Sequence, residues 1–137
     1  IAVIEAGGFD RLTAFGAARM LAPDRRGDRD LLARLHAMAT ASGAAASLRQ
    51  ERAAAGRTDA RDVLARHRRP TLIVVGAEDT VTPPERSREM ADLVPGARFE
   101  ILPGCGHFTP LEAQERVTAL LAEWLAAPAE ATTGVGV

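Results

Sequence analysis

The chain has 137 residues, of which 47% are hydrophobic and 4% aromatic, so its length suits one ordinary domain. Its formal net charge of -1 argues against a dedicated nucleic-acid binder, and no apolar run approaches the roughly 20 residues that a membrane span requires. A single cysteine excludes an internal disulfide and a Cys-based zinc site, which is compatible with a reducing cytoplasm.

The start of the chain gives two further expectations. Ile-Ala-Val-Ile-Glu lacks the basic region and the long apolar core of a secretory signal, so we expect a cytoplasmic protein. Because residue 1 is Ile and not Met, we also expect the chain to be a piece of a longer protein. Arginine is concentrated in residues 1–69, which we interpret as a solvated helical face, with steering of anionic substrates as the alternative.

Residues 1–69 carry a helical pattern rich in Ala, Leu and Arg, and we find no convincing strand in their sequence. Acidic residues that can cap helices and glycines that can end them divide this region into segments. We expect a first segment ending at Gly7-Gly8, helices at about 10–21 and from Asp28 or Asp30 to Ser42-Gly43, another at about 44–55, and a short one from Thr58 or Asp59 to His67.

The second half of the chain begins with a strand that ends in an acidic turn. Residues 71–75, Thr-Leu-Ile-Val-Val, are β-branched at four of five positions and bounded by Pro70 and Gly76. This pattern predicts a strand buried on both faces, as in a parallel sheet. Ligands of open α/β sheets bind outside the carboxyl ends of the strands, so Asp79, in the turn that follows, lies where chemistry would occur.

A second strand ends in a histidine turn. Residues 98–102, Arg-Phe-Glu-Ile-Leu, predict the strand, and Pro-Gly-Cys-Gly leads from it to His107. Adjacent strands lie about 4.8 Å apart, so Asp79 and His107 can come within hydrogen-bond reach. A carboxylate on one imidazole nitrogen leaves the other nitrogen as a general base. The sequence therefore predicts a catalytic acid and base at neighbouring strand ends.

Both turns lead into helices through the same motif, Thr-Pro-x-Glu. Thr82 with Glu85, and Thr109 with Glu112, each fit a capping box. The second helix carries apolar residues at helical spacing, which predicts one stripe against a sheet face. The residues of this stripe are Val117, Leu120, Leu121, Trp124 and Leu125.

The two predicted strands do not make a complete sheet. With one crossover helix they form a βαβ unit, but purely parallel sheets have several strands and two covered faces. The first strand would keep an unpaired apolar edge, which is a known aggregation hazard. We therefore expect further strands to come from outside this sequence.

The two turns resemble the C-terminal half of the α/β-hydrolase superfamily. Residues 69–84 look like that fold's seventh strand and acid turn, and residues 103–112 look like its histidine turn. Residues 56–64 resemble the junction of cap and core in small-ester and lactone hydrolases similar to 3-oxoadipate enol-lactonases. By this resemblance Asp79 is the acid and His107 the base of a catalytic triad.

The resemblance implies a partial α/β-hydrolase fold in the α/β class. We expect a helical cap at 1–69, a βαβα part of the core at 70–127, and a disordered tail at 128–137. It also implies hydrolysis of a small carboxylic ester or lactone, with no metal, organic cofactor, nucleic acid or membrane involved. The missing N-terminal half of the fold would be a required partner.

The nucleophile of such a triad is a serine in a G-x-S-x-G elbow, and Ser42, Ser47 and Ser87 are not flanked in that way. We therefore expect the serine to lie outside this chain, and the chain alone to be inactive. Cys105 offers an alternative nucleophile, because it stands two residues before His107. The other interpretation of Cys105 is a small residue tolerated in a tight turn.

Other side chains leave alternatives open. Glu78 is the alternative acid, and His107 could instead cap or pack in a loop. We interpret His36 and His67 as ordinary surface or cap residues. Four apolar side chains could line an acyl or ring pocket or simply pack between helices; they are Phe15, Met20, Met38 and Phe108.

Two rival functions compete with the hydrolase. A non-catalytic interaction or regulatory module derived from the same fold would be soluble and cooperative by itself, whereas a hydrolase piece with an unpaired strand edge would be poorly soluble. A nucleotide-binding βαβ unit would place Asp79 on a ribose, but no G-x-G-x-x-G accompanies the first strand.

Overall fold

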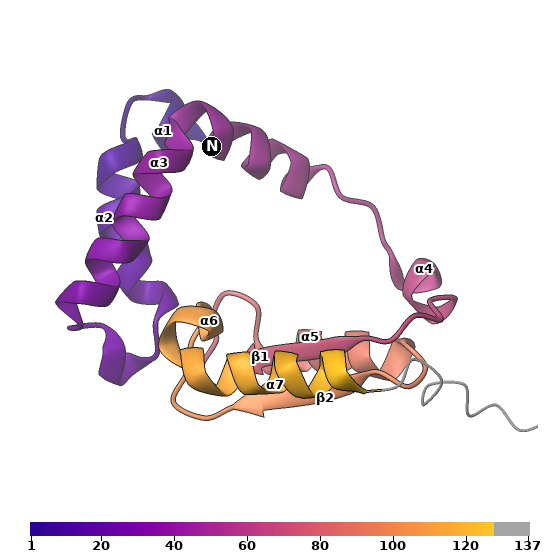
Figure 1. The fold of residues 1–137 in the computed structure, drawn as a ribbon. Helices are drawn as coiled ribbons and strands as arrows, with labels where there is room; N and C mark the ends of the chain where they lie inside the picture. The colour runs from indigo at the N-terminus through magenta and orange to yellow at the C-terminus, as the bar shows by residue number, and fades with distance from the viewer. Residues whose placement is uncertain (128–137) are drawn as a thin grey trace, which may run out of the picture.

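A computed structural model describes residues 1–127, apart from the side chains of residues 10–12, 14 and 15. The tail that we expected to be disordered, 128–137, lies outside this range. The described elements form a helical half followed by a half with two strands (Figure 1). In chain order they are α1 (Ala2–Glu5), α2 (Phe9–Met20), the 3-10 turn η1 (Pro23–Arg25), α3 (Arg29–Ala55), α4 (Arg61–Ala65), β1 (Leu72–Gly76), α5 (Pro84–Leu93), β2 (Arg98–Leu102), α6 (Thr109–Glu112) and α7 (Gln114–Ala126).

The helical half follows the predicted segments, including the break at Gly43. Asp28 caps α3, because its Oδ1 accepts a hydrogen bond from the Leu31 N–H at 3.0 Å. At Gly43 the backbone turns to φ 77° and ψ 160°, yet α3 continues to Ala55. Two helical segments thus meet at a kink at Gly43, where the sequence predicts the first to end, since glycine adopts positive φ without a steric penalty.

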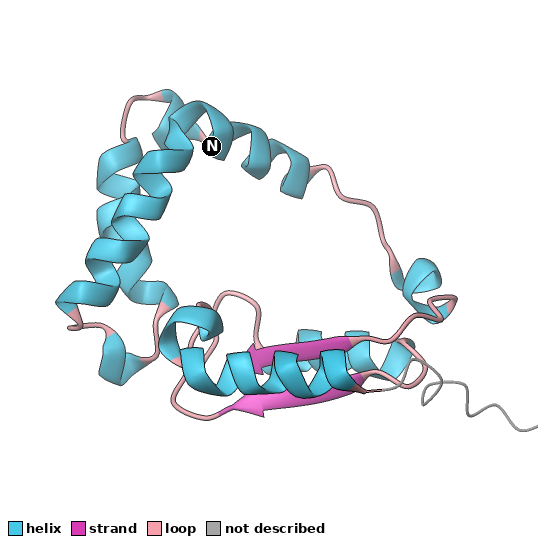
Figure 2. Ribbon diagram, in the orientation of Figure 1, coloured by secondary structure: helices cyan, strands magenta, loops and turns pink. Residues whose placement is uncertain are grey.

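The two strands form a parallel sheet, as predicted. Their register runs from Leu72 opposite Arg98 to Gly76 opposite Leu102. Helices α5 and α7 lie on opposite sides of this sheet (Figure 2). The result is a βαβα unit in which both sheet faces are covered, as a parallel sheet requires.

The core between α7 and the sheet is built around Leu120, which is fully buried and packs with Leu102 and Cys105. The predicted apolar stripe is wrong in part, because Leu121 is 44% and Leu125 74% exposed. A sheet of two strands is too narrow to cover every residue of the stripe.

A second apolar cluster joins the helical half to the histidine turn. Leu21, Leu31 and Leu35 are buried together, and Phe108 and Leu111 pack against them. Because Phe108 follows His107 directly in the sequence, this cluster fixes where the helical half lies relative to the candidate site.

The capping boxes predicted at Thr82 and Thr109 are wrong. Helix α5 begins at Pro84 with Pro83 at its cap, and α6 begins at Thr109 itself; neither cap residue makes a side-chain hydrogen bond. The hydroxyl of Thr82 donates to Asp79 instead. The predicted second helix is also divided at Ala113, where φ of -135° leaves helical geometry between α6 and α7.

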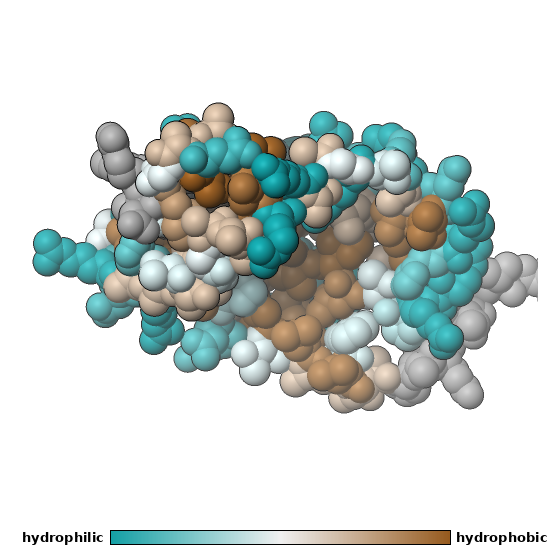
Figure 3. Space-filling model, turned by 90° about the horizontal axis from the view of Figure 1, so that it is seen from above, coloured by the Kyte–Doolittle hydropathy of each residue, from teal (hydrophilic) through white to brown (hydrophobic). Residues whose placement is uncertain are grey.

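Hydrophobic residues remain visible on the surface. Seen from above, they gather along the middle of the molecule between hydrophilic rims (Figure 3). Ile101 on β2 and Val81 after β1 are among the exposed large side chains. No helix within residues 1–127 is both long and apolar enough to cross a membrane.

Candidate active site

The acid turn and the histidine turn lie side by side and are joined through their backbones. The N–H of Ala77 donates to the Leu102 carbonyl at 2.9 Å, and that of Glu78 donates to the Cys105 carbonyl at the same distance. These bonds continue the pairing of β1 and β2 beyond the strands. The carboxyl ends of the strands therefore carry both turns to one edge of the sheet, as in other open α/β sheets.

The helical half contacts the histidine turn directly. The N–H of His107 donates to the carbonyl of Met20, the last residue of α2, at 2.7 Å. A Cβ on Gly106 would overlap the backbone of residues 20–22, so only glycine permits this approach. The glycine before the histidine thus serves close packing and not a positive φ.

Asp79 and His107, 28 residues apart, form a hydrogen bond of 2.9 Å between Oδ2 and Nδ1. The side chain of Asp79 is 4% exposed and that of His107 33% exposed. Asp79 Oδ1 also accepts from the N–H groups of Val81 at 2.8 Å and Thr82 at 2.9 Å, and Oδ2 accepts from the Thr82 hydroxyl at 2.9 Å. The carboxylate is buried but fully hydrogen-bonded, as a buried charge must be.

These contacts set the pKa of Asp79. Burial acts to raise this pKa, but the hydrogen bonds from His107, Thr82 and Val81 together hold it below the ordinary value of 3.8. The acid therefore remains charged near neutral pH. A charged carboxylate on Nδ1 fixes the tautomer that carries its proton there and leaves Nε2 as the basic nitrogen.

Thr82 contacts the Asp79–His107 pair, whereas sequence reasoning assigned it to a helix cap. Its hydroxyl lies 2.9 Å from Asp79 Oδ2 and 3.3 Å from His107 Nδ1, so it touches both members of the pair. A threonine three residues after an acid fits either a cap or this contact, and the sequence alone does not separate the two.

The structure distinguishes Asp79 from Glu78 as the partner of His107, and His107 from the other two histidines. Glu78 is exposed, and within residues 1–127 the carboxyl group hydrogen-bonded to His107 is that of Asp79. His36 is exposed on α3 and His67 is exposed in the loop after α4, in agreement with their interpretation as surface or cap residues.

Cys105 is a core residue. It is 3% exposed and packs with Leu102 and Leu120 below the sheet edge. Burial, with a smaller contribution from the charge of Glu112, raises the pKa of its thiol. A reactive cysteine needs the opposite conditions, namely access and a lowered pKa. The arrangement supports the packing interpretation of Cys105.

Glu112 keeps only part of the capping role that the sequence predicts, since it bonds the N–H of Phe108, the N-cap of α6, and also two N–H groups outside that helix. It is 8% exposed, and its carboxylate accepts backbone hydrogen bonds from Ala22, Gly106 and Phe108. The Thr-Pro-x-Glu motif drew attention to this residue as a capping glutamate. Its true partners include a residue 90 positions earlier, which no local pattern can indicate.

A hollow of about 460 Å³ lies beside the histidine turn, between α1, α2 and α3. Met20 and Phe108 line it, whereas Met38 is 54% exposed and lies outside the lining, and the side chain of Phe15 is not among those described. The ring of Phe108 lies edge-on to that of His107, with 5.6 Å between centroids. The hollow is mainly apolar, with Ser47 and Glu51 among its polar residues.

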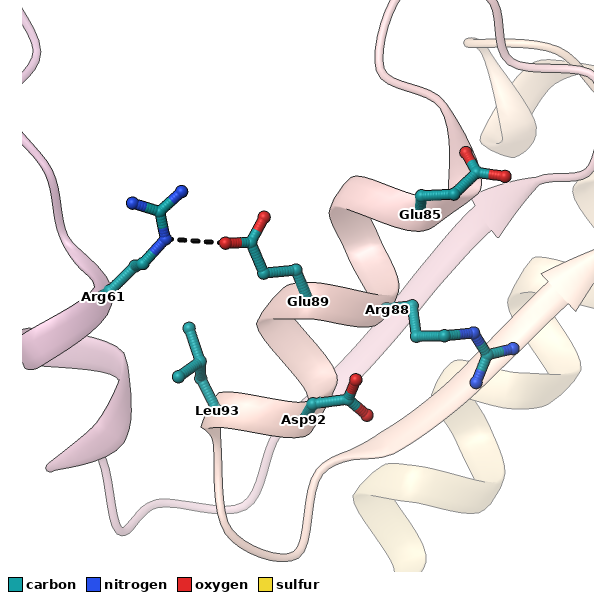
Figure 4. A pocket seen from close by; sticks show the side chains of 6 residues that line it. All are labelled: Arg61, Glu85, Arg88, Glu89, Asp92 and Leu93. Atoms are coloured by element: carbon teal, nitrogen blue, oxygen red, sulfur yellow. Dashed lines mark hydrogen bonds and ion pairs between the residues drawn. The ribbon is translucent and has the colours of Figure 1, made fainter.

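A second hollow lies between α4 and α5 and has a charged lining (Figure 4). Arg61 Nε donates to Glu89 Oε1 across it at 2.6 Å. Its lining residues do not include Asp79, His107 or the groups that hydrogen-bond them. Within residues 1–127, no cluster of three or more His, Cys, Asp or Glu side chains could hold a metal ion.

Comparison with known proteins identifies the class. The family described as alpha/beta hydrolase fold matches residues 18–114, which is more than half of the sequence. The chain therefore belongs to the alpha/beta hydrolase fold family. The expected α/β class and partial hydrolase fold are confirmed.

Particular relatives extend this result. A thermophilic esterase from Thermogutta terrifontis has a TM-score of 0.73 at 28% identity, over 90% of this chain and 47% of the esterase. The enol-lactonase from Burkholderia xenovorans LB400 has a TM-score of 0.72 at 20% identity, over 92% of this chain and 48% of the lactonase, which confirms the expected likeness at the level of the fold. A proline iminopeptidase from Lactobacillus helveticus is 36% identical over 64 residues, or 47% of this chain and 21% of the relative. The chain thus spans about half the length of these solved relatives, and the match covers about a fifth of the curated one.

Proposed function

We propose that this chain supplies the cap, the acid and the base of a hydrolase that cleaves a small carboxylic ester or lactone. The proposal depends on one observation, the hydrogen bond of 2.9 Å between His107 Nδ1 and Asp79 Oδ2 at the ends of neighbouring parallel strands. In this role His107 is the general base and Asp79 orients and stabilises its imidazole. Residues 1–69 form the cap.

The chemistry proceeds through an acyl-enzyme. His107 Nε2 takes the proton of a serine hydroxyl as its oxygen attacks the ester carbonyl, and the same nitrogen returns that proton to the alcohol that leaves. Water then attacks the carbonyl of the acyl-enzyme while His107 Nε2 takes its proton. The same nitrogen returns this proton to the serine oxygen, and the carboxylic acid is released. The serine belongs to a G-x-S-x-G elbow outside residues 1–137, carried by the N-terminal half of the fold, whose strands would pair with the free edge of β1.

The substrate class is proposed from the hollow beside His107. Its volume of about 460 Å³ and its lining by Met20, Leu35 and Phe108 suit a small apolar acyl or ring group. Because the rings of Phe108 and His107 contact each other, a group bound in this hollow would lie next to the proposed base. The esterase and lactonase among the similar structures support the same class of substrate.

The test uses the complete coding sequence that includes this chain. The protein encoded by this sequence is assayed against short p-nitrophenyl esters and small lactones. The wild type is compared with the variants His107→Ala and Asp79→Asn. We expect kcat to fall about 100-fold or more in both variants, since a positioned base and its orienting acid each contribute on this scale. His36→Ala is the matched control and should retain wild-type activity, because His36 is exposed on α3. Full activity of His107→Ala would remove His107 from the mechanism.

A non-catalytic interaction or regulatory module is the second candidate. It is favoured by the sequence itself, in which Ser42, Ser47 and Ser87 lack the elbow pattern. This candidate predicts that residues 1–137 alone are soluble and unfold cooperatively. The hydrolase proposal predicts that the isolated chain aggregates through the unpaired edge of β1. It also predicts that the chain becomes soluble when the N-terminal half of the core is present.

A further inference from the structure

We infer that Glu112 is a positioning residue for His107, which it holds in place by clamping the histidine turn to the cap. This inference rests on the proposed function, since it concerns the orientation of the base. Glu112 lies at the end of α6, five residues after His107, and is 8% exposed. Its carboxylate contacts no other charged side chain by a hydrogen bond within the described residues, and its acceptors are used on backbone N–H groups.

The two oxygens of the carboxylate have different partners. Oε1 accepts from the N–H of Gly106 at 3.0 Å and of Phe108 at 3.1 Å, the residues on either side of His107. Oε2 accepts from the N–H of Ala22 at 2.8 Å, just after α2. One oxygen therefore holds the turn and the other holds the cap.

Every N–H from residue 106 to 108 is thereby fixed. Glu112 holds the two outer groups, and the Met20 carbonyl accepts from the N–H of His107 between them at 2.7 Å. With these bonds made, the peptide planes around His107 cannot rotate without leaving backbone donors unpaired, which is unfavourable for each group. The direction of the imidazole toward Asp79 depends on these planes.

The clamp continues into the cap. The backbone oxygen of Glu112 accepts from Arg25 Nη1 at 3.1 Å, and Arg25 Nη2 pairs with Asp28 at 2.9 Å. Asp28 is the N-cap of α3. A continuous set of bonds thus runs from the N-cap of α3 to the turn that carries the base.

The variants are chosen because the two oxygens of the Glu112 carboxylate bond different backbone groups. Glu112→Ala removes all three bonds to backbone N–H groups. Glu112→Gln retains one carbonyl oxygen, and it should face Gly106 and Phe108, because that orientation keeps two bonds and loses one. Glu85→Gln is the matched control, because Glu85 occupies the same place in the first Thr-Pro-x-Glu motif and is exposed.

The readout is NMR at low temperature of the complete protein that includes this chain, with circular dichroism to verify folding. In Glu112→Ala we expect the Nδ1 proton of His107 to exchange with water about tenfold faster or more, as for the loss of one or two hydrogen bonds. In Glu112→Gln we expect a rise of about threefold in this rate, and about tenfold faster exchange of the Ala22 amide with the Gly106 and Phe108 amides still protected. Glu85→Gln should match the wild type.

The outcomes separate the clamp from the proposed function. Asp79→Asn calibrates the signal, because it alters the group that holds the Nδ1 proton. If Asp79→Asn leaves the signal unchanged, the Asp79–His107 pair is not formed and the proposed function fails with it. If Asp79→Asn changes the signal but the Nδ1 proton exchanges at the wild-type rate in Glu112→Gln and in any folded Glu112→Ala, the positioning role alone is overturned.

Discussion

A methyl group on Gly76 would overlap the carbonyl oxygen of Gly106, because the end of β1 and the histidine turn touch backbone to backbone. The carbonyl of Cys105 is equally close to the same point. This contact leaves no room for any side chain between the turn that carries Asp79 and the turn that carries His107. The hydrogen bond between Asp79 and His107 therefore depends on the absence of a side chain at Gly76.

The first prediction follows from this contact. Gly76→Ala should lower the free energy of unfolding by about 1–3 kcal/mol or more, because the backbone that it meets cannot move aside as a side chain can. Gly16→Ala is the control: Gly16 lies within α2 and, apart from its chain neighbours and the adjacent helix backbone, no atom of the described side chains or backbone lies within 4 Å of an added Cβ, so alanine should stabilise the helix by about 0.5–1 kcal/mol. Urea unfolding of the complete protein that includes this chain, monitored by circular dichroism, measures both, and equal stability of the two variants would contradict the close contact.

The stability of the fold should depend on pH through Asp79. Hydrogen bonds hold the pKa of this buried acid below 3.8 despite its burial, so the folded state binds the proton less tightly than the unfolded state. Its stabilising contribution is therefore complete above about pH 5 and is lost as pH falls through the folded pKa. Asp79→Asn has no group to titrate and should show a shallower decline.

Urea unfolding at a series of pH values from neutral to acidic measures this difference. At neutral pH the Asp79→Asn variant should be the less stable protein, because an amide cannot accept all four hydrogen bonds that the carboxylate accepts. The two stability curves should approach each other below about pH 4. Curves that stay parallel over the whole range would show that Asp79 does not bind its proton more weakly in the folded state.

Much of the site could be predicted from strand ends alone. An apolar strand, a glycine turn and an acid, followed by the same arrangement with a histidine, suffice to bring Asp79 and His107 together, because parallel strands end at the same edge. The contacts that hold Asp79 and His107 in place could not be predicted from the sequence. Thr82 and Glu112 occupy positions that suit helix caps, and their bonds to Asp79 and Ala22 form only when the two turns pack against each other and against the helical half.

The helices also show which features a local sequence pattern can predict and which it cannot. Periodicity predicted α2, α3 and α7 well, since helical spacing is a local property. It also predicted that Leu121 and Leu125 are covered, and they are exposed. How far an apolar stripe is buried depends on the width of the surface that it meets, which is a property of the whole assembly of strands.

Cys105 should be unreactive in the folded protein. Burial raises the pKa of its thiol, so little thiolate is present and the reagent has no access. Native protein should therefore react with a disulfide reagent at least about tenfold more slowly than protein in denaturant. Ser42→Cys in a Cys105→Ala background is the control, because Ser42 is exposed and its replacement should react rapidly. Rapid labelling of native Cys105 would restore it as a candidate nucleophile.

The last prediction separates the two sides of α7. Leu120 is fully buried against Leu102 and Cys105, so Leu120→Ala removes apolar contacts and leaves a cavity. We expect the free energy of unfolding to fall by about 2–5 kcal/mol. Leu125→Ala makes the same chemical change on the same helix at a side chain that is 74% exposed, and should change stability by about 0.5 kcal/mol or less. Because both substitutions have the same effect on helix propensity, the difference between them measures packing against the sheet. A loss at Leu125 as large as that at Leu120 would mean that a surface covers this end of α7 in solution.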